Sequence, residues 1–192
     1  MAILDKKLLA GMRARALAYA GERREVIKAA GDAQHLAKRA IFALQRGDRV
    51  EAGEKLAVAE KALLGLAKRF QKKPALLDEG SHQAALEEYV EAQVFYQFVT
   101  TGKMGGLGKL MVPDEVFVAG ICDVPGELYR YAIRAATARD FATVKQCAAA
   151  ADEIIGELVE FNLTSYLRTK FDQAKQALHK LEQVVYETSL SR

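Results

Sequence analysis

Prolines occur only three times in this chain of 192 residues, at positions 74, 113 and 125. A proline inside a helix removes a hydrogen bond and clashes with the preceding turn, so its rarity leaves room for long helices. The chain lacks tryptophan and is rich in Ala, Leu, Glu, Lys and Arg, which have high helix propensity. No segment alternates apolar and polar residues with period two. These features predict an all-α protein.

Apolar residues at helical intervals predict helices over about 3–46 (one helix or two nearly collinear ones), 48–71, 81–99, 113–136, 140–161 and 165–189. Gly47 and Asp48 supply a stop and the next N-cap, and Ser81 can cap the third helix. The glycine-rich stretch 100–110 is interpreted as a flexible connection. Long helices joined by short loops usually pack antiparallel. We therefore expect one domain over residues 1–192 that oligomerises to cover its remaining apolar faces.

Charge is unevenly distributed along the chain. The net charge is +3, but residues 1–73 hold 17 Lys or Arg against 8 Asp or Glu, and the remainder holds 11 against 17. A basic N-terminal part suits a polyanionic partner, although long helices with exposed Lys and Arg produce the same counts. The two cysteines indicate neither a disulfide framework nor a zinc site. With no signal-type run and no apolar stretch that could span a bilayer, we expect a cytoplasmic protein without a membrane partner.

Two helices carry acidic pairs within apolar surroundings. Glu88 and Glu91 share one face of the third helix, which is apolar nearly all round from Tyr89 onward, whereas Glu87 is expected in solvent. Asp123 and Glu127 follow the uncharged run 116–122 and lie one turn apart. Buried carboxylates must be protonated, ion-paired or bound to a cation. These ingredients fit an oxygen-ligated divalent metal, Mg²⁺ with Mn²⁺ as a substitute.

The spacing leaves a second interpretation open, in which Glu91 pairs with Arg130 or Arg134 and Asp123 caps a helix that starts at Val124. The three histidines form no Glu-x-x-His pair, which disfavours di-iron chemistry. An all-α metal-dependent nucleotide pyrophosphohydrolase stays an alternative, because such enzymes also use Glu-x-x-Glu on a helix.

Four segments carry a resemblance to a known family: AKRAIFAL (37–44), LEEYVEA (86–92), GICDVPGELYR (120–130), and LRTKFD (167–172) followed by LEQVVYE (181–187). In this order, in an all-helical chain, they resemble translin and translin-associated factor X. The resemblance implies a hollow octamer of seven-helix chains that binds single-stranded RNA and DNA. It also implies a Mg²⁺-dependent endoribonuclease, because the factor X branch carries the acids that stand here as Glu88, Glu91, Asp123 and Glu127. One chain type would then build the shell as a homo-octamer and supply the active sites.

Basic side chains are expected to position the RNA strand without reading its bases. The candidates are Lys38, Arg39 and Arg130, followed by Arg23, Arg24 and Arg134. A non-catalytic shell that binds single-stranded RNA or DNA is the main alternative to the nuclease. Pro125 replaces the small residue usual in the family motif, and we expect it to kink its helix rather than break it.

Overall fold

The structure, a computed structural model, describes residues 4–190 as helices and their connections, and no strand occurs in this range. The helices are α1 (Lys6–Gln45), α2 (Arg49–Phe70), α3 (Pro74–Leu77), α4 (Gly80–Thr101), α5 (Asp114–Thr137), α6 (Phe141–Val159) and α7 (Ser165–Leu190). The predicted all-α class is confirmed. Six of the helices match the predicted ranges within a few residues, and the one-turn α3 was not predicted.

Local chemistry explains most of the helix ends. Asp5, Asp48 and Asp140 accept hydrogen bonds from the first free backbone N–H groups of α1, α2 and α6. Gly47, at φ 86°, ends the preceding turn, as the Gly47-Asp48 pair predicts. The Ser81 prediction is wrong: α4 begins at Gly80, and the Ser81 hydroxyl is buried inside the helix without a partner among the described residues.

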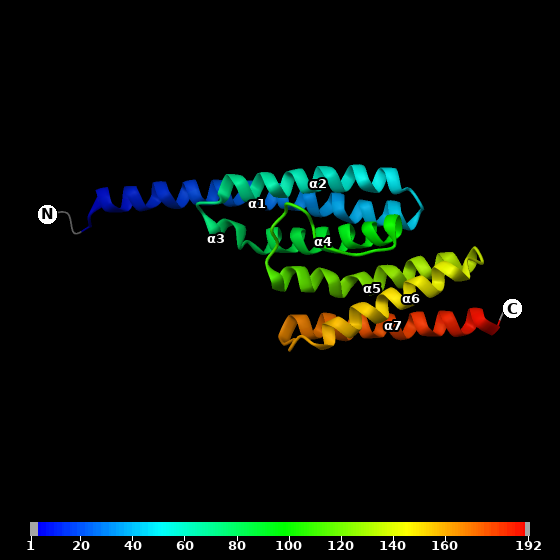
Figure 1. The fold of residues 1–192 in the computed structure, drawn as a ribbon. Helices are drawn as coiled ribbons and strands as arrows, with labels where there is room; N and C mark the ends of the chain where they lie inside the picture. The colour runs from blue at the N-terminus through cyan, green and yellow to red at the C-terminus, as the bar shows by residue number, and fades with distance from the viewer. Residues whose placement is uncertain (1–3, 191–192) are drawn as a thin grey trace.

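The helices lie roughly side by side in the order α2, α1, α4, α5, and α6 and α7 cover the far side of α5 (Figure 1). The core between these helices contains fully buried side chains from α1, α4 and α5. They include alanines of α1, Val90, Val94 and Phe95 of α4, and Leu128 of α5. The middle helices α4 and α5 are thus enclosed on both sides. This position explains why acidic residues on them are removed from solvent.

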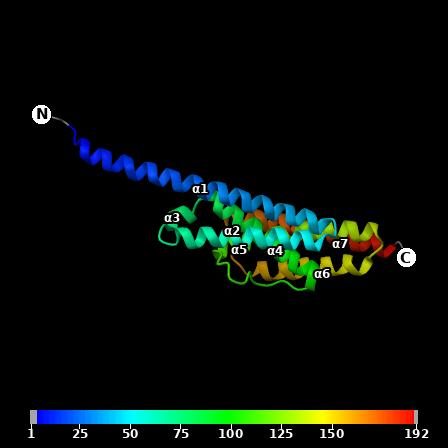
Figure 2. The ribbon, with the colours of Figure 1, turned by 90° about the horizontal axis from the view of Figure 1, so that it is seen from above.

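α1 is a single helix of 40 residues, without a break at its three glycines. Its N-terminal half projects alone beyond the other helices (Figure 2). Its buried residues begin only at Val26. On the projecting part, Leu8, Met12 and Tyr19 remain exposed by 58%, 50% and 42%.

α5 runs without interruption through Pro125. The alternative in which Asp123 caps a helix starting at Val124 is therefore wrong, and Asp123 and Glu127 share a continuous helix one turn apart. Gly120 packs tightly against α4, since a Cβ there would lie 2.6 Å from the Val90 Cβ. A Cβ at Gly126, in contrast, would meet no atom within 4 Å, so this chain does not need that glycine for close packing.

Candidate functional site

The packing of α4 against α5 brings the four predicted acids into one another's electrostatic field. Glu91 lies at the centre of the group: burial, and then the negative charges of Asp123, Glu88 and Glu127, raise its pKa from 4.5 to about 9. Glu91 forms no hydrogen bond or ion pair with any residue in the range 4–190. The expected alternative, a Glu91 pair with Arg130 or Arg134, is not found. Lys170 lowers the pKa of Glu91 only in part, so near neutral pH this acid keeps its proton in the metal-free protein.

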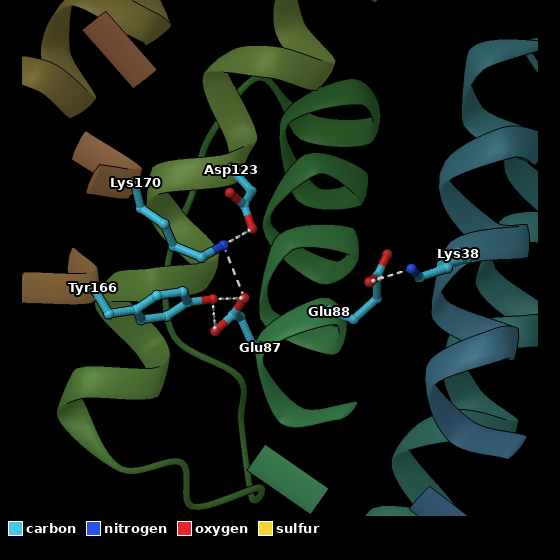
Figure 3. A network of polar contacts seen from close by, with 6 residues as sticks. All are labelled: Lys38, Glu87, Glu88, Asp123, Tyr166 and Lys170. Atoms are coloured by element: carbon cyan, nitrogen blue, oxygen red, sulfur yellow. Dashed lines mark hydrogen bonds and ion pairs between the residues drawn. The ribbon is translucent and has the colours of Figure 1, made fainter. Parts of the chain in front are cut away.

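Glu88 points from α4 toward α1, where the Lys38 ammonium lies 3.3 Å from its carboxylate (Figure 3). Burial raises the pKa of Glu88, and Lys38 opposes that rise. The Lys38 side chain is half exposed, so it can leave Glu88 for solvent at small cost.

Asp123 is paired with Lys170, which was not among the predicted site residues. Lys170 of α7 reaches between α4 and α5, where its ammonium contacts the Asp123 carboxylate and lies 2.8 Å from Glu87 Oε1 (Figure 3). Tyr166, one turn earlier on α7, donates its hydroxyl hydrogen to Glu87 at 2.9 Å. The pKa of Asp123 is raised by burial, against the lowering effect of Lys170. Glu87 was expected in solvent, and this was wrong because α7 covers it.

Glu127 is held from two directions. Arg130, one turn along α5, pairs with Glu127 at 2.9 Å and places its guanidinium over the Phe42 ring, 5.5 Å from the centroid. From α1, the buried Gln45 amide donates to Glu127 Oε2 at 2.8 Å and to the Glu127 backbone carbonyl at 3.0 Å. The last turns of α1 therefore fix the orientation of this acid.

Carboxylate oxygens are the donors that Mg²⁺ and Mn²⁺ prefer, and a bound cation would stabilise the ionised form of a partly buried acid such as Glu91, which has no ion-pair partner among the described residues. In this respect the donor set fits a divalent ion. As they stand, no three Asp, Glu, His or Cys side chains within residues 4–190 converge closely enough to hold one. The carboxylates must therefore reorient, and Lys170 must release Asp123, before a metal could bind there.

The predicted basic residues fall into three pairs. Lys38 and Arg130 contact the acids, and Arg39 and Arg134 are exposed and form no ion pair within the described part of the chain. Arg23 and Arg24 lie about four turns from Lys38 along α1. Arg23 pairs with Glu79 at 2.5 Å, and the Arg24 Nε donates to the Ala20 carbonyl. These two are not brought to the acidic group.

Four further residues belong to the site but were not predicted from the sequence. They contact the predicted acids or each other: Gln45, Glu87, Tyr166 and Lys170. For Lys170 a signal existed: it occupies the same helical stripe as Ala174, Ala177, Leu181 and Val184, all buried. A lysine in an apolar stripe requires a buried acidic partner. No sequence pattern indicated which acidic residue would pair with Lys170.

The fold and the site together define an all-helical protein with a cluster of partly buried carboxylates on its two central helices. Residues 21–192 match the family model described as the Translin family, and the chain belongs to that family. It is similar to the solved structure "Crystal structure of AfC3PO", with a TM-score of 0.88 and 24% identity over 96% of this chain and 98% of that one. "Crystal structure of apo-NeC3PO" gives 0.87 and 19% over 98% and 100%.

A third similar structure, "Structure of AfC3PO - duplex RNA complex", gives a TM-score of 0.84 at 24% identity over 96% of this chain and 97% of that one. At these identities the likeness establishes a shared fold. A comparison with curated proteins gives no match. No helix within residues 4–190 is both long and apolar enough to cross a membrane.

Proposed function

We propose that this protein is a metal-dependent endoribonuclease that cleaves single-stranded RNA inside a homo-oligomeric shell. The observation that carries the proposal is the gathering of Glu88, Glu91, Asp123 and Glu127, in which Glu91 has no hydrogen-bond or ion-pair partner among the described residues and its pKa is raised to about 9. A structural role alone would be served better by apolar residues, because buried like charges destabilise a fold. Such a cluster is typical of functional sites.

Glu88, Glu91 and Asp123 would hold a Mg²⁺ or Mn²⁺ ion, and Glu127 would be a fourth ligand or a base beside it. The ion would supply charge stabilisation for the phosphoryl oxygens and a lowered pKa for a bound water. Gln45 and Arg130 orient the Glu127 carboxylate from either side. Their contacts keep this acid in place while the strand enters.

The RNA would be held through its phosphates. Lys38 and Arg130, both half exposed, lie beside the acids and can exchange a carboxylate for a phosphate. Arg39 and Arg134 add exposed positive charge on the same two helices. Support for an RNA partner comes from the family and from the similar AfC3PO structure, which is a complex with duplex RNA. Preference for single-stranded RNA, and binding of single-stranded DNA, are part of our proposal.

The projecting part of α1 supports a homo-oligomer, for which the family resemblance favours an octamer. Leu8, Met12 and Tyr19 continue the helical stripe that begins to be buried at Val26, yet this chain leaves them exposed. Covering such a stripe with a second copy would remove apolar surface from water. Native mass spectrometry of the wild type and of a Leu8→Glu, Met12→Glu variant tests this: the variant should lose its larger assemblies. An Arg13→Glu variant is the matched control.

The nuclease proposal is tested by incubating a labelled single-stranded RNA with the protein, in Mg²⁺ or in a chelator. We expect cleavage in Mg²⁺ only, and a loss of about a hundredfold or more in Asp123→Ala and in Glu91→Gln. Asp152→Ala, which removes an exposed acid of α6, should cleave like the wild type. Cleavage that persists unchanged in Asp123→Ala would contradict the assignment of this site.

Two other outcomes have distinct meanings. RNA binding that weakens with salt, without cleavage at any metal concentration, would indicate a non-catalytic binding shell. Hydrolysis of free nucleoside triphosphates without RNA cleavage would instead indicate a helical nucleotide hydrolase. Each result would replace the nuclease proposal.

A further inference from the structure

Among the described residues, the Lys170 ammonium is the one buried cation at the acidic group. The side chains of Lys38 and Arg130 are 52% and 47% exposed, whereas that of Lys170 is 11% exposed. It lies between two carboxylates from different helices, Asp123 of α5 and Glu87 of α4 (Figure 3). Leaving a largely buried ammonium without an acidic partner is costly, so Lys170 should keep at least one of the two carboxylates.

Of these two partners, only Asp123 belongs to the proposed metal ligands. Glu87 lies on the other side of the ammonium from Asp123 in Figure 3 and is fixed by the Tyr166 hydroxyl at 2.9 and 3.1 Å. The ammonium therefore has a second carboxylate that a metal bound at Asp123 does not need. It can release one partner and keep the other.

We propose that Lys170 is a built-in counter-cation that occupies Asp123 in the metal-free protein and moves fully onto Glu87 when a divalent ion binds. Glu87 and Tyr166 then form the holding position for the displaced ammonium. This inference rests on the proposed metal-dependent function. It gives roles to three residues that are not metal ligands, and it makes metal binding a competition between two cations for one carboxylate.

The competition predicts how metal affinity responds to substitution. Lys170→Met removes the competing charge while keeping much of the stem, so Mn²⁺ should bind at least about tenfold more tightly, because a unit charge a few ångströms away acts more strongly in a largely buried site than in water. Glu87→Gln removes the holding position, so the ammonium stays on Asp123 and Mn²⁺ should bind several-fold more weakly. In the Lys170→Met background, Glu87→Gln should have a smaller effect, because no ammonium needs holding.

The experiment is a titration of the purified full chain with Mn²⁺, with free Mn²⁺ measured by electron paramagnetic resonance. Lys175→Met is the matched control, because it removes a lysine of the same helix that pairs with Asp172 and contacts the Phe171 ring. It should bind Mn²⁺ like the wild type. Circular dichroism confirms that each variant is folded, and Lys170→Gln is measured in parallel as a second substitution.

Equal or weaker Mn²⁺ binding in both Lys170 variants would overturn the inference. So would Glu87→Gln binding as tightly as the wild type. A gain in Mn²⁺ affinity without any RNA cleavage would support the counter-cation and contradict the nuclease. Absence of Mn²⁺ binding in the wild type and in every variant would overturn both.

Discussion

Gly120 of α5 lies so close to Val90 of α4 that a Cβ on the glycine would be 2.6 Å from the Val90 Cβ and 2.7 Å from the Glu87 carbonyl oxygen. Both obstacles are rigid parts of α4, so Gly120→Ala must push the two helices apart. We expect a loss of about 1–3 kcal/mol in the free energy of unfolding, measured by urea denaturation.

The matched control is Gly126→Ala on the same helix. No atom lies within 4 Å of a Cβ there, and alanine is the better helix former, so stability should rise by about 0.5–1 kcal/mol. Equal effects of the two substitutions would contradict the tight α4–α5 contact at Gly120.

Glu91 should make the stability of the metal-free protein depend on pH. Its pKa is about 9 in the folded chain and near 4.5 when unfolded. Between these values the folded protein keeps a proton that the unfolded chain releases, so the Glu91 contribution to stability falls as pH rises from about 5 to 9. Glu91→Gln cannot ionise and should remove this slope. Urea denaturation of the wild type and of Glu91→Gln, in the presence of a chelator, measures the free energy of unfolding across this pH range. Parallel curves of stability against pH for the two proteins would contradict the prediction.

The same raised pKa predicts proton release on metal binding. A metal requires Glu91 in its ionised form, so binding at pH 7 must expel the proton that the folded protein holds. Calorimetric titrations with Mg²⁺ in buffers of different ionisation enthalpy should report release of about one proton per site. The released number should approach zero in Glu91→Gln or as the pH rises above about 9.

Gln45 should stabilise the Glu127 end of the site. Gln45→Met keeps the side-chain volume but removes both hydrogen bonds to Glu127. We expect a loss of about 1 kcal/mol in the free energy of unfolding. Gln183→Met, which removes an exposed hydrogen bond to Glu187, is the control and should change stability little. An equally small effect of Gln45→Met would show that Arg130 alone holds Glu127.

Arg39 should contribute to RNA binding through its charge. It is exposed and forms no ion pair within residues 4–190, so a phosphate need not displace an acidic partner. Arg39→Ala should weaken binding of unrelated single-stranded sequences to the same extent. It should also reduce the slope of log affinity against log salt by about one. Fluorescence anisotropy at several salt concentrations measures this. Lys145→Ala on α6 is the control, and an equal change in both proteins would exclude a specific role for Arg39.

Local sequence predicted the helices well because their signals are local. Gly47 ends α1, and Asp48 caps α2, through contacts within a few residues of the chain. The prediction that Ser81 caps its helix was wrong because a serine near a helix start resembles an N-cap in the sequence, whether or not its hydroxyl reaches a free N–H. The single turn of α3 is too short to show periodicity.

The site was predictable in part. The acids were found because charges in an apolar helix face are costly, and the packing of α4 on α5 brings them together. Glu87 was misplaced because its burial is caused by α7, whose Tyr166 lies 79 residues away in sequence. The pairing of Lys170 with Asp123 depends on how α7 crosses α5, and no spacing rule within one helix contains that information.

The length of α1 has one more consequence. A helix of 40 residues extends about 60 Å as a single element. Its last turns supply Lys38 and Gln45 to the acids, while its first turns stand free of the bundle. A molecule bound at the free end would therefore be connected to the acidic group through one continuous helix, so it could alter the alignment of these acids without touching them.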